Sequence, residues 1–246
     1  MKANKISIKP VRIGKSSRIV AMLTLTMLGF AQLAQAQKEL AMNALTKYGL
    51  DKDLINKDYF KQPDNYAYDL EQTTTAANKT TVLLAKYDPQ AASPWTVLSV
   101  DGKAPKKADI SAFEKAQAEE NERSKPQDAS YRVDEETADK LVISYKLDPA
   151  TLSKELAFMK DCRIYIHISL QSKRLLQSEL VNEKPVKIKI LTAEKFISTV
   201  QYQWDTTAHR YFTLQNEVDM QGKFMGQKVD VHTQAKYSNF KKADTE

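Results

Sequence analysis

Alternation of apolar and polar residues dominates the second half of the chain. In "CRIYIHISLQS", Ile164, Ile166 and Ile168 fall on one side of an extended strand, and Tyr165 and His167 fall on the other. A period of two is typical of strands with one buried face. The same alternation, bounded by turn residues, predicts strands at 66–71, 80–88, 95–100, 131–133, 141–147, 162–170, 174–182, 185–191, 195–205, 210–220 and 226–240.

Helical spacing is confined to a few segments. The segment 107–124 predicts the longest helix, with Asp109 or Ser111 as its N-cap. Shorter helices are predicted at 51–60 and 148–161. Another is predicted at 38–49, where the apolar stripe and the C-capping glycine are Leu40, Ala41, Ala44, Leu45, Tyr48 and Gly49.

This imbalance between strands and helices predicts the fold class. One strand face with four large apolar residues is worth on the order of 10 kcal/mol when buried, so it must be covered. We therefore expect a mainly β (α+β) fold: a strongly curved antiparallel sheet or half-open barrel of about 10 to 11 strands with two or three covering helices. Residues 37–246 are expected to form this single domain, with the helical insertion near 107–124.

The first 36 residues have the pattern of an export signal. Six basic residues and no acidic ones are followed by an apolar run at 19–30 and by small residues at Ala34 and Ala36. An apolar run of this length is shorter than the roughly 20 residues that cross a membrane, which argues against an anchor. We expect a signal peptide cleaved after Ala36 and a periplasmic mature protein with no transmembrane segment.

Removal of that leader changes the charge of the chain. Six of the 37 Lys and Arg residues precede Gln37, which leaves 31 basic residues against 31 Asp and Glu residues. The basic pI of the whole chain therefore comes from the leader. Because the remaining chain has no excess positive charge, a nucleic-acid partner is excluded.

Motifs for catalysis are absent. Only Gly49, Gly102, Gly222 and Gly226 follow the leader, without phosphate-binding or nucleophile-elbow spacing. The lone Cys162 is expected to be a buried apolar residue, and the three histidines lack metal-ligand spacing, so no enzyme, cofactor or metal site is expected. The nearest approach to chemistry is Asp230, His232 and Gln234 on one strand face: a weak metal or acid-base site, or the wet side of a sheet.

The last strand, "GQKVDVHTQAKYSNF", raises the functional question. Its apolar face covers either helices of the same chain or a bound guest molecule. Sparse helical cover favours an apolar cavity, although large side chains filling the interior are the alternative. The candidate lining residues, taken from the most apolar strand faces, are Trp95, Ile164, Ile166, Ile168, Phe196, Val200, Trp204, Phe212, Leu214 and Met220.

This order of elements resembles a known family. The N-terminal helix, the curved sheet, the helical insertion and the segments "YDP", "WTVLSVDGKAP" and "YSNF" are similar to the uncharacterised branch of the LolA/LolB-like periplasmic lipoprotein carriers. The resemblance implies a concave, aromatic-lined shelter for acyl chains with helices as a lid. We therefore expect an exported carrier of a lipid, acyl chain or lipoprotein. The alternative is a structural or regulatory envelope module with a filled core that contacts another envelope protein.

Overall fold

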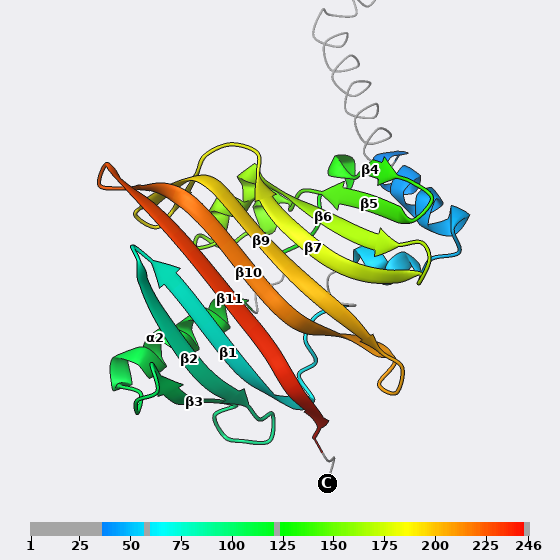
Figure 1. Cartoon of the computed structure of the whole chain (residues 1–246). Helices are drawn as coiled ribbons and strands as arrows, with labels where there is room; N and C mark the ends of the chain where they lie inside the picture. Colours follow the sequence, from blue (N-terminus) through cyan, green and yellow to red (C-terminus); the bar gives the residue numbers. More distant parts are fainter. Residues whose placement is uncertain (1–35, 57–59, 121–123, 244–246) are drawn as a thin grey trace, which may run out of the picture.

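A single antiparallel sheet organises the protein (Figure 1). The computed structural model describes residues 36–56, 60–120 and 124–243, so the predicted export signal, apart from Ala36, lies outside the described residues. The sheet contains eleven strands and few helices accompany it, which confirms the predicted mainly β fold class. The strands are β1 (Tyr66–Ala76), β2 (Lys79–Tyr87), β3 (Trp95–Val100), β4 (Arg132–Glu136), β5 (Lys140–Tyr145), β6 (Cys162–Ser169), β7 (Arg174–Asn182), β8 (Val186–Ile188), β9 (Leu191–Asp205), β10 (Arg210–Phe224) and β11 (Gln227–Lys242).

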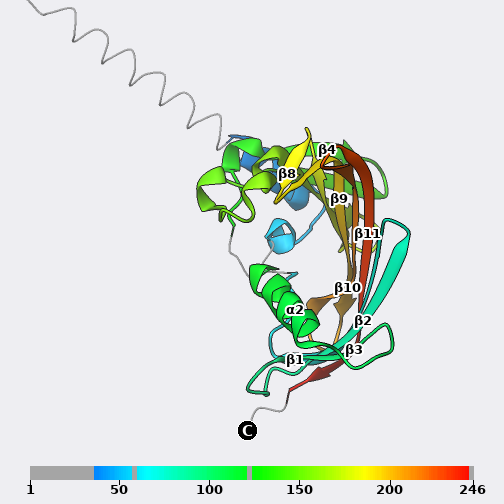
Figure 2. The same cartoon turned by 90° about the vertical axis from the view of Figure 1, so that its left-hand side faces the viewer.

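The strand order keeps the sheet open. It runs β3-β2-β1-β11-β10-β9-β7-β6-β5-β4, and β8 pairs with β9 outside this path. The last strand therefore lies beside the first, in the middle of the sheet, while β3 and β4 form the two ends. Figure 2 shows a strongly curved sheet with α2 (Lys107–Glu120) and the short helical turns on its concave side.

The helical segments follow the sequence pattern with local differences. Residues 36–47 are helical, and Gly49 has φ +62° while the Leu50 N–H donates to the Leu45 carbonyl, as expected for a glycine that ends a helix. The segment 51–60 contains η1 (Lys52–Ile55), and 148–161 forms two separate 3₁₀ turns, η4 (Pro149–Thr151) and η5 (Ala157–Asp161). A further 3₁₀ turn is η3 (Asp128–Ser130).

The predicted N-cap of the long helix is wrong. Helix α2 begins at Lys107, so Asp109 is its third residue rather than its cap. The Asp109 carboxylate accepts the Lys106 N–H at 2.9 Å, which satisfies a donor that the helix leaves free. The Ser111 pattern therefore lies inside the helix.

Three apolar clusters lie on the concave side. The first joins the helix at 36–47 to β5 and β6, the second places Phe113 of α2 against β1, β2 and β11, and the third joins η5 to β8 and β9. Ala235 of the last strand belongs to the second cluster and Tyr237 packs against it, so this part of the strand shares an apolar cluster with Phe113 of α2. Cys162 is buried in the third cluster, as the sequence predicts, and burial raises the pKa of its thiol to about 12.

A buried cation anchors the η3 turn to the convex side of β6. The Arg163 guanidinium donates to Glu183 at 2.9 Å, to the Ser130 carbonyl at 2.9 Å and to the Ser144 hydroxyl at 3.1 Å. Lys146 donates to the other carboxylate oxygen of Glu183 at 2.6 Å. The hydrogen bonds from Lys146 and then Arg163 lower the pKa of Glu183 from its usual 4.5 to about 2.

This carboxylate should make stability depend on pH. Because the folded-state pKa of Glu183 is depressed, its contribution is present above pH 4.5 and is lost as the pH falls toward 2. Since the side chain is partly exposed, we expect a contribution of only about 1 kcal/mol. Urea unfolding at several pH values should show a larger loss of stability for the wild type than for Glu183→Gln between pH 4.5 and 2. A stability difference that stays constant over this range would contradict the prediction.

Candidate functional site

The concave face of the sheet is the first candidate site. Alternation along β9 places Phe196, Val200 and Trp204 on this face. On β10, Met220 lies opposite Phe196 and Val218 lies opposite Ser198, so the same face continues across both strands. These residues share one face because both strands are regular between them; whether the face binds a ligand stays a prediction.

Four predicted lining residues are already buried by the chain itself. Ile166 and Ile168 are fully buried in the first cluster, against Ile143 and Leu141 of β5. Phe196 packs against Phe158 of the η5 turn with ring centroids 5.6 Å apart, and Phe212 is also buried. These four side chains are parts of the core, and a ligand could contact them only if a neighbour moved.

A β-bulge separates two predicted residues from the others on β10. The register shifts between Thr213 and Gln215, so Tyr211 lies opposite Trp204 while Phe212 lies opposite Gln203. Leu214 falls within the bulge and is exposed. The predicted face of Phe212, Leu214 and Met220 is therefore broken, because one extra residue reverses the alternation.

The other five predicted residues are half-buried. Trp95 packs edge-on against Phe113 of α2 at 5.1 Å, and Trp204 packs against Tyr211 at 5.0 Å. The Arg174 guanidinium lies over the Trp204 ring, 4.1 Å from its centroid. The half-buried set consists of Trp95, Ile164, Val200, Trp204 and Met220.

Polar residues form the middle of the concave face, between the clusters. We define the central strip as five half-buried residues that are neighbours on β9, β10 and β11: Ser198, Val200, Asn216, Val218 and Thr233. Ser198 donates to the Asn216 side-chain oxygen at 3.3 Å. In the part of the chain that the structure describes, Val200 belongs to none of the three clusters, whereas Val218 contacts the third. The sequence indicates this polar position, because strand alternation places Ser198 on the same face as Phe196 and Val200.

Hydrogen bonds at the edges of the strip hold polar groups on the concave side. The hydroxyls of Ser178 and Tyr202 are 2.8 Å apart, and those of Thr74 and Thr233 are 3.3 Å apart. Burial raises the pKa of Tyr202, against the smaller lowering effect of the Ser178 bond. The concave face is therefore amphipathic, with apolar side chains beside uncharged donors and acceptors.

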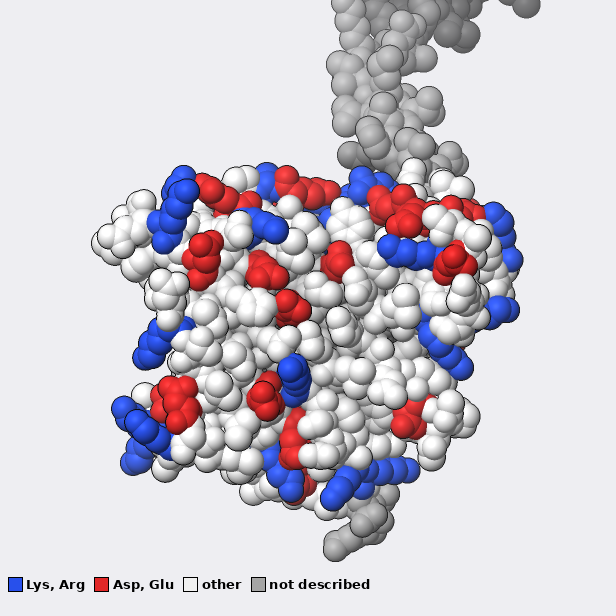
Figure 3. Space-filling view, viewed as in Figure 1, with Lys and Arg blue, Asp and Glu red and all other residues white. Residues whose placement is uncertain are grey.

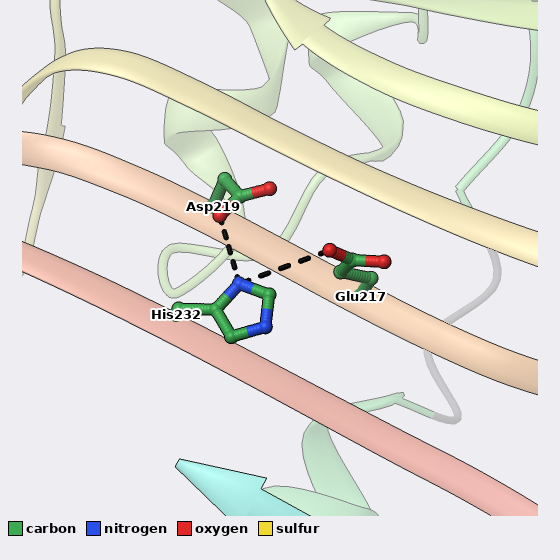
Figure 4. A group of neighbouring side chains, drawn as sticks. All are labelled: Glu217, Asp219 and His232. Atoms are coloured by element: carbon green, nitrogen blue, oxygen red, sulfur yellow. Dashed lines mark hydrogen bonds and ion pairs between the residues drawn. The ribbon is translucent and has the colours of Figure 1, made fainter. Parts of the chain in front are cut away.

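The convex face carries the second candidate site. Figure 3 shows this face, on which uncharged residues cover most of the middle and several acidic residues lie among them. On β11, His232 lies directly opposite Asp219 of β10, and its Nδ1 is 2.8 Å from the Asp219 Oδ1. Glu217 approaches the same nitrogen, with its Oε1 at 3.8 Å (Figure 4). These three groups offer metal-ligand atoms within 4.8 Å of one another.

The sequence singles out His232 but pairs it with the wrong carboxylate. Asp230 lies opposite Gln221, and the imidazole bonds to Asp219 instead. The turn between β10 and β11 fixes which residues of the two strands lie opposite each other. Met225 and Gly226 both have positive φ, as a two-residue hairpin turn requires, so counting back from Phe224 opposite Gln227 places Asp219 opposite His232.

Fold and site together define a curved, open antiparallel sheet with helices on one side and two distinct faces. No protein-family profile matches the chain, and no curated protein matches it. Among solved structures, the chain is weakly similar to "GphF Dehydratase 1", with 12% identity, 73% of this chain and 77% of that chain covered, and a TM-score of 0.14. An isomerase-inactive variant of the same GphF domain gives 11% identity, coverage of 76% and 78%, and a TM-score of 0.12. Likeness at this level carries no argument about fold or activity.

Within residues 36–56, 60–120 and 124–243, no helix combines the length and the apolar character needed to cross a bilayer.

Proposed function

We propose that the protein is an exported periplasmic carrier that shelters a hydrophobic ligand against the concave face of its sheet. The ligand class is a lipid, an acyl chain or a lipoprotein. The observation that carries the proposal is the central strip, where apolar and uncharged polar side chains lie half-buried between three separate clusters. The resemblance to LolA/LolB-like carriers and the leader-like pattern of residues 1–36 support the same function.

The chemistry of the strip suits an amphipathic ligand. Val200 and Val218 offer apolar contact, and each buried CH₂ group of an acyl chain contributes about 0.8 kcal/mol. Ser198, Asn216 and Thr233 offer hydrogen-bonding groups without a charge. A ligand with an acyl chain and an uncharged polar group, such as an ester or an amide, would satisfy both kinds of side chain.

Filling the strip should weaken binding. We expect Val200→Trp to weaken the binding of a fluorescent fatty acid by at least about tenfold, because the indole would occupy the space that the ligand needs. The measurement is a fluorescence titration of the purified protein.

Gln201→Trp is the matched control, since this neighbouring residue is exposed and lies on the convex face opposite Gln215. Both variants should unfold at similar urea concentrations. Equal affinity of the two variants, or no binding of the probe by the wild type, would contradict the proposed carrier function.

A second candidate function is an envelope interaction module with a filled core. Ring packing around Tyr68 favours it, because this ring contacts four others: Tyr87, Trp95, Tyr237 and Phe240. Native mass spectrometry of the protein purified from the periplasm separates the candidates. A species with bound lipid supports the carrier, and a ligand-free species that also binds no added lipid supports the module.

A further inference from the structure

We propose that Glu217, Asp219 and His232 form a binding site for a divalent transition-metal ion, with Zn²⁺ as the ion that fits best. The site lies on the convex face, so it is independent of the ligand proposed for the concave face. It differs from the weak site of Asp230, His232 and Gln234 that the sequence offers, because its two carboxylates come from β10 and meet His232 only through the pairing of β10 with β11.

The spacing of the ligand atoms fits a single ion. Metal–ligand bonds of about 2.1 Å in a tetrahedral site place adjacent ligand atoms about 3.4 Å apart. The His232 Nδ1 is 2.8 Å from one carboxylate oxygen and 3.8 Å from the other, which brackets this value. Small rotations of the side chains would place all three atoms around one centre.

The hydrogen bond between His232 and Asp219 does not involve Glu217, whose other carboxylate oxygen accepts from the Gln215 side chain at 3.2 Å. Nδ1 holds at most one proton, which it can donate to Asp219 at 2.8 Å, whereas the Glu217 oxygen at 3.8 Å is beyond hydrogen-bond distance. Figure 4 shows both carboxylates turned toward the same ring nitrogen. Within the described part of the chain, the only ion pairs of Glu217 and Asp219 are with His232, so two acids on one strand face lack a permanent cation.

Ligand type selects the ion. Imidazole nitrogen suits Zn²⁺ and its neighbours, whereas Ca²⁺ takes six to eight oxygen ligands and Mg²⁺ prefers oxygen and water. One imidazole and two carboxylates match a three-ligand zinc site with a fourth position open to water. The side chains are between 33% and 49% exposed, which leaves that position accessible to solvent.

A surface hollow adjoins the site. It has a volume of about 320 Å³ and is bordered by the β1–β2 turn, with Asp219 and His232 in its wall. Asn78 of the turn and Gln221 of β10 also line it. A small anion or a carboxylate of a partner could therefore reach the open position of the ion.

The test is Zn²⁺ binding by the purified, tag-free protein, followed by isothermal titration and by the visible absorption of Co²⁺ as a substitute ion. We expect one Zn²⁺ to bind to the wild type. Each of the three variants His232→Ala, Asp219→Asn and Glu217→Gln should weaken this binding at least about tenfold. The last two keep the shape of the side chain and remove only its charge. His209→Asn removes an exposed imidazole at a positive-φ turn position, which Asn tolerates, and should leave the affinity unchanged.

Several results would contradict the proposed metal site. Equal Zn²⁺ affinity of the wild type and His232→Ala would overturn it, as would no binding up to about millimolar Zn²⁺. Tighter binding of Ca²⁺ or Mg²⁺ than of Zn²⁺ would also overturn it, because such a site would not use the imidazole. Urea unfolding without metal should give similar midpoints for all four variants, which shows that a loss of binding is not a loss of fold.

Discussion

Replacing Ile166 with alanine should lower the free energy of unfolding by about 3 to 4 kcal/mol, as is typical when a fully buried isoleucine loses its side chain. Ile166 is 0% exposed on β6, lies opposite Ile143 of β5 and packs in the cluster that holds the helix at 36–47. The helix and the two strands cannot close around the lost volume together. Urea unfolding followed by circular dichroism measures the loss.

The same variant distinguishes core from ligand site. Because Ile166 packs inside the first cluster and the central strip lies elsewhere, fatty-acid affinity of the folded variant should stay within about twofold of the wild type. Ile190→Ala is the matched control, since Ile190 is 74% exposed in the β8–β9 turn and its loss should change stability by less than about 0.5 kcal/mol. If Ile166→Ala unfolds like the wild type but binds ligand poorly, Ile166 is a lining residue after all.

The architecture was predictable because it depends on local alternation. A period of two identifies strands wherever one face is buried, and the segments at 66–71, 95–100 and 162–170 all appear as strands. Local alternation does not show which strands are neighbours in the sheet. The pairing of β1 with β11 joins residues such as Leu70 and Tyr237, and no local pattern in either segment specifies that contact.

The candidate site was predictable only in part, for two physical reasons. First, a bulge such as the one at Leu214 reverses the inward face without changing the apolar pattern. Second, alternation shows which residues point inward but not whether the chain itself covers them. Ile168 and Val200 look equivalent in sequence, yet Ile168 is fully buried in the first cluster and Val200 is half-buried between the clusters.

Replacing Gly222 with alanine should destabilise the protein by about 3 kcal/mol, within the range for side chains forced into a packed interior. A Cβ atom at this position would lie 2.2 Å from the Thr192 carbonyl oxygen and 2.9 Å from the Ala193 Cα. Neither atom can move aside at low cost, because both residues pair with β8 on one side and with β10 on the other. The register shift between Gln221 and Gly222 lies at this close approach, so glycine is what permits the bulge.

Gly226→Ala separates this steric effect from the loss of glycine itself. Gly226 has φ +83° in the β10–β11 turn, and a Cβ atom there would meet nothing within 4 Å. Only backbone strain remains, which costs about 1 to 2 kcal/mol for an L-residue in the left-handed region. Urea unfolding should therefore rank Gly222→Ala as the less stable variant. Equal stability of the two variants would mean that β9 yields to the added methyl group, and that Gly222 is not required for the bulge.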